Sequence, residues 1–176
     1  MKSKQPKKEK AAKRGGRPQP PRGERQGDTY RHKAKKVEKK LPDTVVCPEC
    51  DVVFHRGRWQ WAPAAKRSGA KRDLCPACQR IRDKYPAGEV TLSGPFVLEH
   101  REELLGRIRN LEAKEKAEHP LNRLVEIRRE GDALVVTTTD VHLAHAIGTS
   151  LFQAYRGTLH APWAEEGDLL RLSWER

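Results

Sequence analysis

Two cysteine pairs in matching turns constrain this chain more than any other feature of its sequence. The turns are Cys47-Pro48-Glu49-Cys50 and Cys75-Pro76-Ala77-Cys78, and they contain the only four cysteines among 176 residues. A C-P-x-C turn directs two thiolates toward one ion at about 2.3 Å, and two such turns complete a tetrahedral shell. The sequence therefore predicts a closed, structural metal site that holds together a segment too small for a core of its own.

A disulfide framework and a redox-active thiol pair are the competing uses of paired cysteines. The chain has no run of about 18 apolar residues, and its start, MKSKQPKKEK, lacks the apolar stretch of a secretory signal. We therefore expect a cytoplasmic protein with no membrane association, where thiols stay reduced. One structural zinc ion is the expected cofactor, and a rubredoxin-like iron site and a redox thiol pair remain open.

The first 40 residues account for the whole net positive charge of the protein. They contain 16 Lys and Arg residues against four acidic residues, a surplus that equals the formal net charge of +12 for the full chain. Their Pro, Gly, Gln and Lys content cannot bury enough surface to offset the ordering entropy. We predict a disordered basic tail over residues 1–40, which either contacts phosphates without reading bases or serves only as a solubilising extension.

A zinc-binding module is expected over residues 41–93. Residues 52–61 read as a hairpin in which Trp59 and Trp61 share a face with His55, while Arg58 lies on the other face. A short helix is expected over residues 79–85, ended by the Pro-Ala-Gly sequence at 86–88. A turn, a hairpin and a helix after the second cysteine pair together predict a zinc-ribbon or treble-clef-like module.

This module is basic by itself. Between residues 55 and 84, nine Lys and Arg residues face two acidic residues, a balance of +7 that is typical of a protein with a phosphate-rich partner. The two tryptophans either cover the small core of the module, which is the simpler interpretation, or stack on bases. The candidate nucleic-acid-binding residues are Arg56, Arg58, Lys66, Arg67, Lys71, Arg72, Arg80, Arg82, Lys84, Trp59 and Trp61.

Residues 94–176 are expected to form an α+β domain, after a strand at residues 89–92. Apolar residues at helical spacing predict one long helix over 96–119 with Ser93 as its capping hydroxyl, and Asp140 predicts the cap of a second helix that ends near Tyr155. Strand pairs are expected at 124–129 with 133–138 and at 158–163 with 169–174. The order helix, two strands, helix, two strands predicts helices on one face of an antiparallel sheet.

The sequence contains no catalytic constellation. It has no phosphate loop, no nucleophile elbow and no Gly-rich dinucleotide turn. His142 and His145 lie three residues apart on a predicted helix, and a metal or acid/base role for this pair stays open without a supporting carboxylate-histidine motif. Four cysteines already complete the shell, which favours a packed or solvent-facing His55 over a ligand. We therefore predict that the protein is not an enzyme and has no small-molecule substrate.

The cysteine turns and a later strand-helix segment resemble a known family. The stretches CPEC...LCPACQRIRDKYPAGEVTLSG and ALVVTTTDVHLAHAIGTSLFQAYRG are similar to small bacterial proteins related to the large-ribosomal-subunit export adaptor of eukaryotes and archaea, the third protein of the nonsense-mediated-decay group. The similarity covers about residues 44–160. In that family the cysteine turns bind zinc and the protein docks on the large subunit. The resemblance implies Cys47, Cys50, Cys75 and Cys78 as zinc ligands and the ribosome as a partner.

These features together predict a zinc-stabilised RNA-binding accessory protein that contacts ribosomal RNA or the large ribosomal subunit, in the assembly, quality control or storage of ribosomes. A DNA-binding regulator that uses the same module and tail is one alternative. No predicted helix combines Arg, Asn and Gln on one exposed face, as a major-groove reader does. A protein-interaction adaptor, in which residues 94–176 bind a protein partner, is the other alternative.

Overall fold

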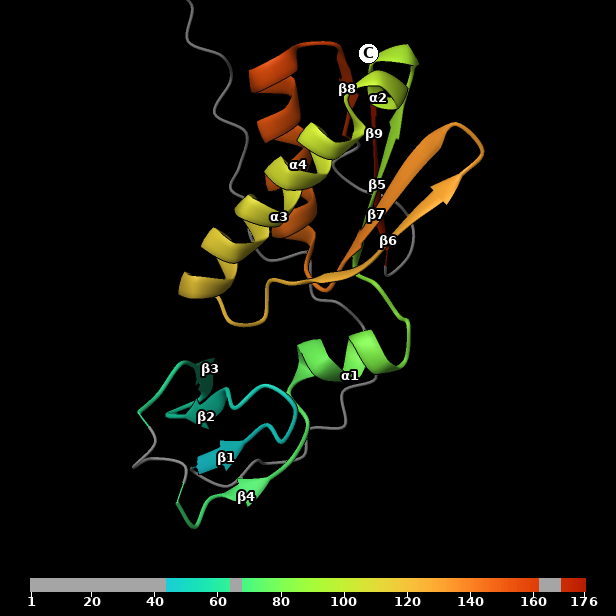
Figure 1. Cartoon of the computed structure of the whole chain (residues 1–176). Helices are drawn as coiled ribbons and strands as arrows, with labels where there is room; N and C mark the ends of the chain where they lie inside the picture. The colour runs from blue at the N-terminus through green and yellow to red at the C-terminus, as the bar shows by residue number, and fades with distance from the viewer. Residues whose placement is uncertain (1–43, 64–67, 162–168) are drawn as a thin grey trace, which may run out of the picture. The chain divides into compact units, whose positions relative to one another are not determined.

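The computed structural model describes residues 44–63, 68–161 and 169–176, all of which belong to one compact unit of the chain. Within these ranges the fold is mixed α+β, with two sheets and four helices (Figure 1). The predicted basic tail over residues 1–40 and the candidate residues Lys66 and Arg67 lie outside the described residues.

The first sheet is small and surrounds the first cysteine pair. Its strand order is β3-β2-β1-β4, with β1 antiparallel to β2, β2 antiparallel to β3, and β1 parallel to β4. Arg56 and Gly57 have φ angles of 51° and 82°, as a two-residue hairpin turn requires. The predicted hairpin is confirmed, but the prediction of its faces is wrong. Arg58 lies directly opposite His55, and Trp59 lies opposite Phe54, so Arg58 shares the face of His55. Trp61 lies beyond the second strand. The strands are β1 (Thr44–Val46), β2 (Val53–His55), β3 (Arg58–Gln60) and β4 (Lys71–Arg72).

Helix α1 (Pro76–Arg82) begins inside the second cysteine pair, three residues earlier than predicted. Cys75 is its N-cap, because the Cys75 Sγ atom accepts a hydrogen bond from the Cys78 N–H group at 3.4 Å. Pro76 has no N–H to leave unpaired and its φ angle already suits the first helical turn. The helix ends at Arg82, because Asp83 caps it and Lys84 turns the chain with a φ angle of 50°.

The second sheet has the strand order β6-β7-β5-β9-β8. Three of its pairs are antiparallel, but β5 pairs in parallel with β9, so the prediction of an antiparallel sheet is wrong at this position. The central strand is β5, which precedes the helices of this domain. Its Val90 and Leu92 side chains are fully buried, and β7 and β9 pair with its two edges. The strands are β5 (Gly88–Ser93), β6 (Leu124–Glu130), β7 (Ala133–Thr138), β8 (Thr158–His160) and β9 (Leu170–Glu175).

The central position of β5 also moves the boundary between the two parts of the fold relative to the predicted one. Residues 88–93 belong to the second sheet, rather than to the module predicted over residues 41–93. The first part of the fold therefore ends with α1 and the short connection to Ala87. We call residues 44–87 the cysteine module and residues 88–176 the sheet domain below.

The long helix predicted over residues 96–119 is two helices, α2 (Pro95–Glu99) and α3 (Arg101–Glu118). The chain leaves helical geometry at His100, which has φ −112° and ψ 23°. Ser93 does not cap the first helix, because Gly94 is the N-cap and no side chain bonds there. Gly94 has a φ angle of 98°, and a Cβ atom at this position would lie within contact of the Arg176 carbonyl oxygen.

Helices α3 and α4 (Val141–Tyr155) lie side by side along one face of the second sheet, as Figure 1 shows. As predicted, Asp140 caps α4, and its Oδ1 atom accepts a hydrogen bond from the His142 N–H group at 2.8 Å. Side chains of both helices and of the sheet form one apolar core. Its largest fully buried members are Leu92, Leu104, Ile108, Leu143, Ile147, Leu151 and Trp174.

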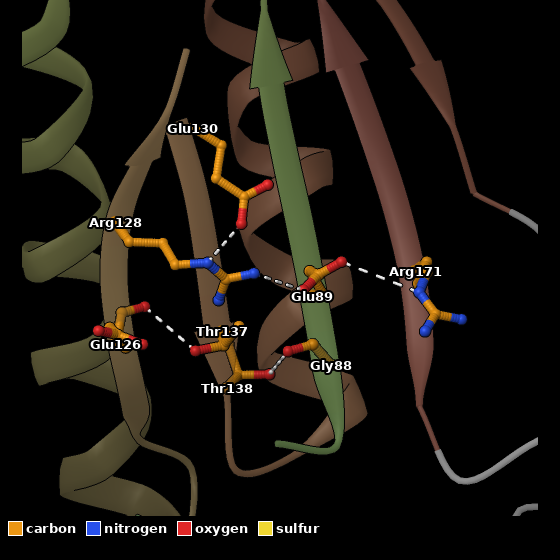
Figure 2. Close-up of polar contacts among 8 residues, drawn as sticks. All are labelled: Gly88, Glu89, Glu126, Arg128, Glu130, Thr137, Thr138 and Arg171. Carbon is orange, nitrogen blue, oxygen red and sulfur yellow. Dashed lines mark hydrogen bonds and ion pairs between the residues drawn. The ribbon is translucent and has the colours of Figure 1, made fainter. Parts of the chain in front are cut away.

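The other face of the second sheet carries a series of linked ion pairs (Figure 2). The Arg128 guanidinium on β6 donates to Glu130 at 2.7 Å and to Glu89 of β5 at 3.1 Å. Arg171 on β9 lies 3.9 Å from the same Glu89 carboxylate. The cations on this face are therefore neutralised by their own neighbours.

Among the helices of the described ranges, none combines the length and the apolar content that a bilayer crossing requires.

The glycine at the start of α2 provides a test of this fold. We expect Gly94→Ala to lower the free energy of unfolding by about 1–3 kcal/mol, because alanine is strained at this φ angle and its Cβ would meet the Arg176 backbone. Gly106→Ala is the control, since Gly106 lies within α3 with no atom near its Cβ position, and we expect a gain of about 0.5–1 kcal/mol. Denaturant unfolding measures both, and an unchanged midpoint for Gly94→Ala would contradict this placement of the C-terminus.

Candidate metal centre

The four cysteines converge on one point between β1 and α1. Their sulfur atoms all lie within 4.8 Å of one another, and those of Cys50 and Cys75 are 3.7 Å apart. Four sulfurs bound tetrahedrally at about 2.3 Å from one ion lie about 3.8 Å apart. The thiols of Cys47, Cys75 and Cys78 are buried and that of Cys50 is partly exposed. The donor set and its spacing therefore fit one metal ion.

The two cysteine turns reach this arrangement by different local structures. In the first turn, the Asp51 N–H group donates to the Cys47 carbonyl at 3.0 Å, and the Cys47 N–H group donates to the Val52 carbonyl at 2.9 Å. Asp51 has a φ angle of 60°, in the left-handed region that a glycine at this position of a knuckle would occupy. The second turn is the first turn of α1, so its thiols lie at the positive end of a helix.

Burial and backbone hydrogen bonding have opposite effects on the pKa values of the thiols. Burial acts to raise the pKa of Cys47, but backbone hydrogen bonds from Cys75, Glu49 and Cys50 outweigh it and lower the pKa to about 7. Burial raises the pKa of Cys75 to about 11, and it also raises the pKa of Cys78. Thiols gathered in this way do not all ionise without a cation among them, and a bound metal ion supplies that charge.

Arg123 of the sheet domain completes the surroundings of the thiols. Its Nη2 atom donates to Cys50 Sγ at 3.1 Å, and its Nη1 atom donates to Cys78 Sγ at 3.3 Å. The residue is only 5% exposed, and its Nε atom donates to the Pro120 carbonyl at 2.7 Å. Burial acts to lower the pKa of Arg123, but the hydrogen bond to Cys50 and the charges of Cys50, Cys75 and Cys78 together outweigh it and raise the pKa, so the guanidinium stays charged.

The sequence pattern did not indicate Arg123. The residue lies in the connection between α3 and β6, 45 positions after Cys78. Its only local signal is an arginine between two leucines, in the sequence Leu121-Asn122-Arg123-Leu124, where a charge is not expected to be buried. That signal does not say what the guanidinium would contact.

The two tryptophans predicted near the metal site differ in their surroundings. Trp59 is half-buried, packs against the apolar cluster around the cysteines, and lies 5.5 Å from the Phe54 ring. Trp61 is 41% exposed, and its Nε1 atom donates to the Lys116 carbonyl at the end of α3, at 2.8 Å. Trp59 thus covers the core of the module, whereas the Trp61 ring is held in place with part of its surface open.

The described basic candidates lie on the outside of the cysteine module. Arg80 is the most enclosed of them, since its Nη1 atom donates to the Tyr85 carbonyl at 3.3 Å and its guanidinium lies 5.5 Å from the Tyr85 ring centre. The others are exposed and form no ion pair with another described residue. They are Arg56, Arg58, Lys71, Arg72, Arg82 and Lys84.

The histidines considered from the sequence do not join the metal centre. Within the described ranges, the group of side chains that can hold a metal comprises the four cysteines without His55, His142 or His145. His55 lies beside Thr44, with 3.5 Å between its Nδ1 atom and the threonine hydroxyl. Burial lowers the pKa of His145, and the neighbouring His142 lowers it further.

Comparison of the chain with protein-family models, with curated proteins and with solved structures gives no match. What the fold and the site define is a mixed α+β protein with a four-cysteine group that can hold a metal ion.

The metal centre gives a direct prediction. Purified protein should contain one metal ion per chain, and Cys47→Ser or Cys75→Ser should release it, because three thiolates no longer close the shell. We expect residues 44–87 to lose protection from hydrogen exchange in both variants while β5, β7 and β9 stay protected, since the apolar core of the sheet domain is separate. Elemental analysis that finds no metal in protein with a folded cysteine module would refute this.

Proposed function

We propose that the protein is a zinc-stabilised RNA-binding accessory protein, and that its partner is ribosomal RNA, on or near the large ribosomal subunit. The observation that carries the proposal is the set of six exposed Lys and Arg side chains on the cysteine module that form no ion pair with another described residue. Cations without local partners on a small metal-bound unit are suited to phosphate groups. The resemblance of the cysteine turns to ribosome-binding proteins supports ribosomal RNA within this class.

The sheet domain offers a contrast that favours the cysteine module as the contact surface. On the open face of the sheet, Arg128 and Arg171 both lie against Glu89, and Arg128 also pairs with Glu130 (Figure 2). Phosphate binding there would have to displace these carboxylates, whereas Arg56 and Arg58 of the module have no such competitor among the described residues. The charge distribution therefore favours RNA contact through the module.

Trp61 adds a surface that suits single-stranded RNA. Its ring is fixed by the hydrogen bond to Lys116, and with Arg58 it lines a pocket of about 590 Å³. Stacking of a base on such a ring contributes about 1–3 kcal/mol by alanine substitution, and the stacking tolerates any base. Arg58 begins β3 and lines the same pocket, where it can reach a phosphate of the stacked nucleotide, which supports RNA with unpaired bases as the ligand.

Zinc is the proposed metal, and its role is structural. Four sulfur donors close the shell and leave no position for water or substrate, and zinc favours tetrahedral sulfur ligation without redox chemistry. Apparent binding free energies of about 10–16 kcal/mol for zinc in small zinc-binding units are large compared with what a module of this size gains from its core. The zinc-ribbon or treble-clef-like module would therefore hold its basic side chains at fixed positions only when loaded.

Two sets of substitutions with equal charge change test the contact surface. We expect Arg56, Arg58, Arg82 and Lys84 changed together to Gln to weaken binding of a ribosomal RNA fragment and to reduce the slope of log affinity against log salt by about 0.7–0.9 for each cation that no longer neutralises a phosphate. The control changes Arg101, Arg109, Lys114 and Arg129 to Gln, four exposed residues of α3 and β6. Filter binding across a salt series measures both, and equal weakening in the two variants would show that net charge alone matters.

Deletion of residues 1–40 tests the predicted division between tail and module. The shortened protein should bind RNA more weakly with a flatter salt dependence, but it should keep the preference for ribosomal particles over random RNA, because lysines on a flexible tail neutralise phosphates without reading structure. Co-sedimentation with ribosomal subunits in a sucrose gradient measures the preference. An unchanged salt slope would assign the tail to solubility, and stronger binding to duplex DNA than to RNA would favour the DNA-binding alternative.

A further inference from the structure

One short segment of the sheet domain, residues 119–123, lies against the cysteine centre, and we call it the clasp segment. Leu121 packs against the apolar cluster that contains Cys47, Cys75 and Cys78. Arg123 donates to the sulfurs of Cys50 and Cys78 at 3.1 and 3.3 Å. The metal centre is thus enclosed by residues from both parts of the fold.

The charge on Arg123 is the feature of the clasp segment that requires an explanation. Moving a charged guanidinium from water to a buried position costs several kcal/mol unless an opposite charge and good hydrogen bonds offset the loss. Neutral thiols are only weak hydrogen-bond acceptors. Four thiolates around a divalent ion instead form a complex with two net negative charges, and charge-assisted hydrogen bonds to it are the strong kind. The position of the Arg123 charge is therefore more favourable when the centre is loaded than when it is empty.

We propose that Arg123 is an outer residue of the metal site, and that a bound divalent metal is what holds the sheet domain against the cysteine module. The guanidinium recognises the net negative charge of the metal-thiolate complex. It favours a divalent ion over a trivalent one, because a trivalent ion leaves a single negative charge on the complex. This proposal does not depend on RNA binding.

Hydrogen bonds of the clasp segment connect Arg123 to the rest of the sheet domain. The Arg123 N–H group donates to Thr139 Oγ1 at 2.9 Å, and the Thr139 N–H group donates to the Arg123 carbonyl at 2.9 Å. The Leu124 N–H group donates to Glu112 of α3 at 2.8 Å. Thr139 directly precedes Asp140, the cap of α4. If the Arg123 guanidinium left the empty centre for water, these hydrogen bonds at the starts of β6 and α4 would be weakened.

The test measures metal release and hydrogen exchange in full-length protein loaded with zinc. Arg123→Met removes the charge and keeps much of the side-chain length, and we expect zinc release to a chelator to become about 10–100-fold faster, the usual effect of losing a partner of metal ligands. Arg123→Lys keeps the charge but cannot donate to both sulfurs in the bidentate geometry of a guanidinium, and it should give an intermediate rate of zinc release. Arg129→Met is the control, because Arg129 pairs with Asp132 on the surface and should release zinc at the wild-type rate.

Leu121→Ala separates charge from packing in the same segment. It removes an apolar contact with the cysteine cluster and leaves the guanidinium in place, so zinc release should change much less than in Arg123→Met. Release that accelerates equally in Leu121→Ala and Arg123→Met would overturn the proposal, because packing alone would then explain the effect. Wild-type release from Arg123→Met would also overturn it.

Hydrogen exchange supplies a readout in the unaltered sequence. In wild-type protein, removal of zinc should speed exchange at the N–H groups of Arg123, Leu124 and Thr139, whose acceptors are Thr139 Oγ1, the Glu112 carboxylate and the Arg123 carbonyl. The strand amides of β5, which lie inside the second sheet, should keep their protection and serve as the internal reference. Unchanged exchange at the first three amides after complete zinc removal would overturn the proposal, even if an Arg123 variant fails to fold.

Discussion

Compensation of buried charge at the four-cysteine centre is the constraint on which the rest of the structure depends. The cysteine module has a small core in which three of the four cysteines are themselves buried members, so the thiols cannot be separated from its packing. A bound metal ion would turn these thiols into charged ligands, and Arg123 donates hydrogen bonds to two of their sulfur atoms. Local turns, the start of α1 and the contact with the sheet domain therefore all meet at one set of sulfur atoms.

Features set by neighbouring residues could be predicted from the sequence. The cysteine turns, the hairpins β2–β3 and β6–β7 and the cap of α4 at Asp140 all follow from short patterns, and the structure contains each of them. Asp140 is the simplest case, because its carboxylate satisfies an N–H group only two residues away. Interactions between residues close in sequence are therefore enough to specify these elements.

Features set by distant residues could not be predicted in the same way. The glycine cap at Gly94 depends on how the chain passes Arg176, and the parallel pairing of β5 with β9 joins strands from opposite ends of the sheet domain. Arg123 belongs with them, since its sulfur partners are 45 and 73 positions away. No periodicity or spacing within a short window contains these contacts.

In the proposed function, zinc fixes the module, and the described part of the module presents cations that form no ion pair with its described carboxylates. X-ray absorption at the zinc edge of purified protein measures the ligands of the metal directly. We predict four sulfur neighbours at about 2.3 Å and no nitrogen or oxygen neighbour. A histidine or water ligand, or fewer than four sulfurs, would contradict this prediction.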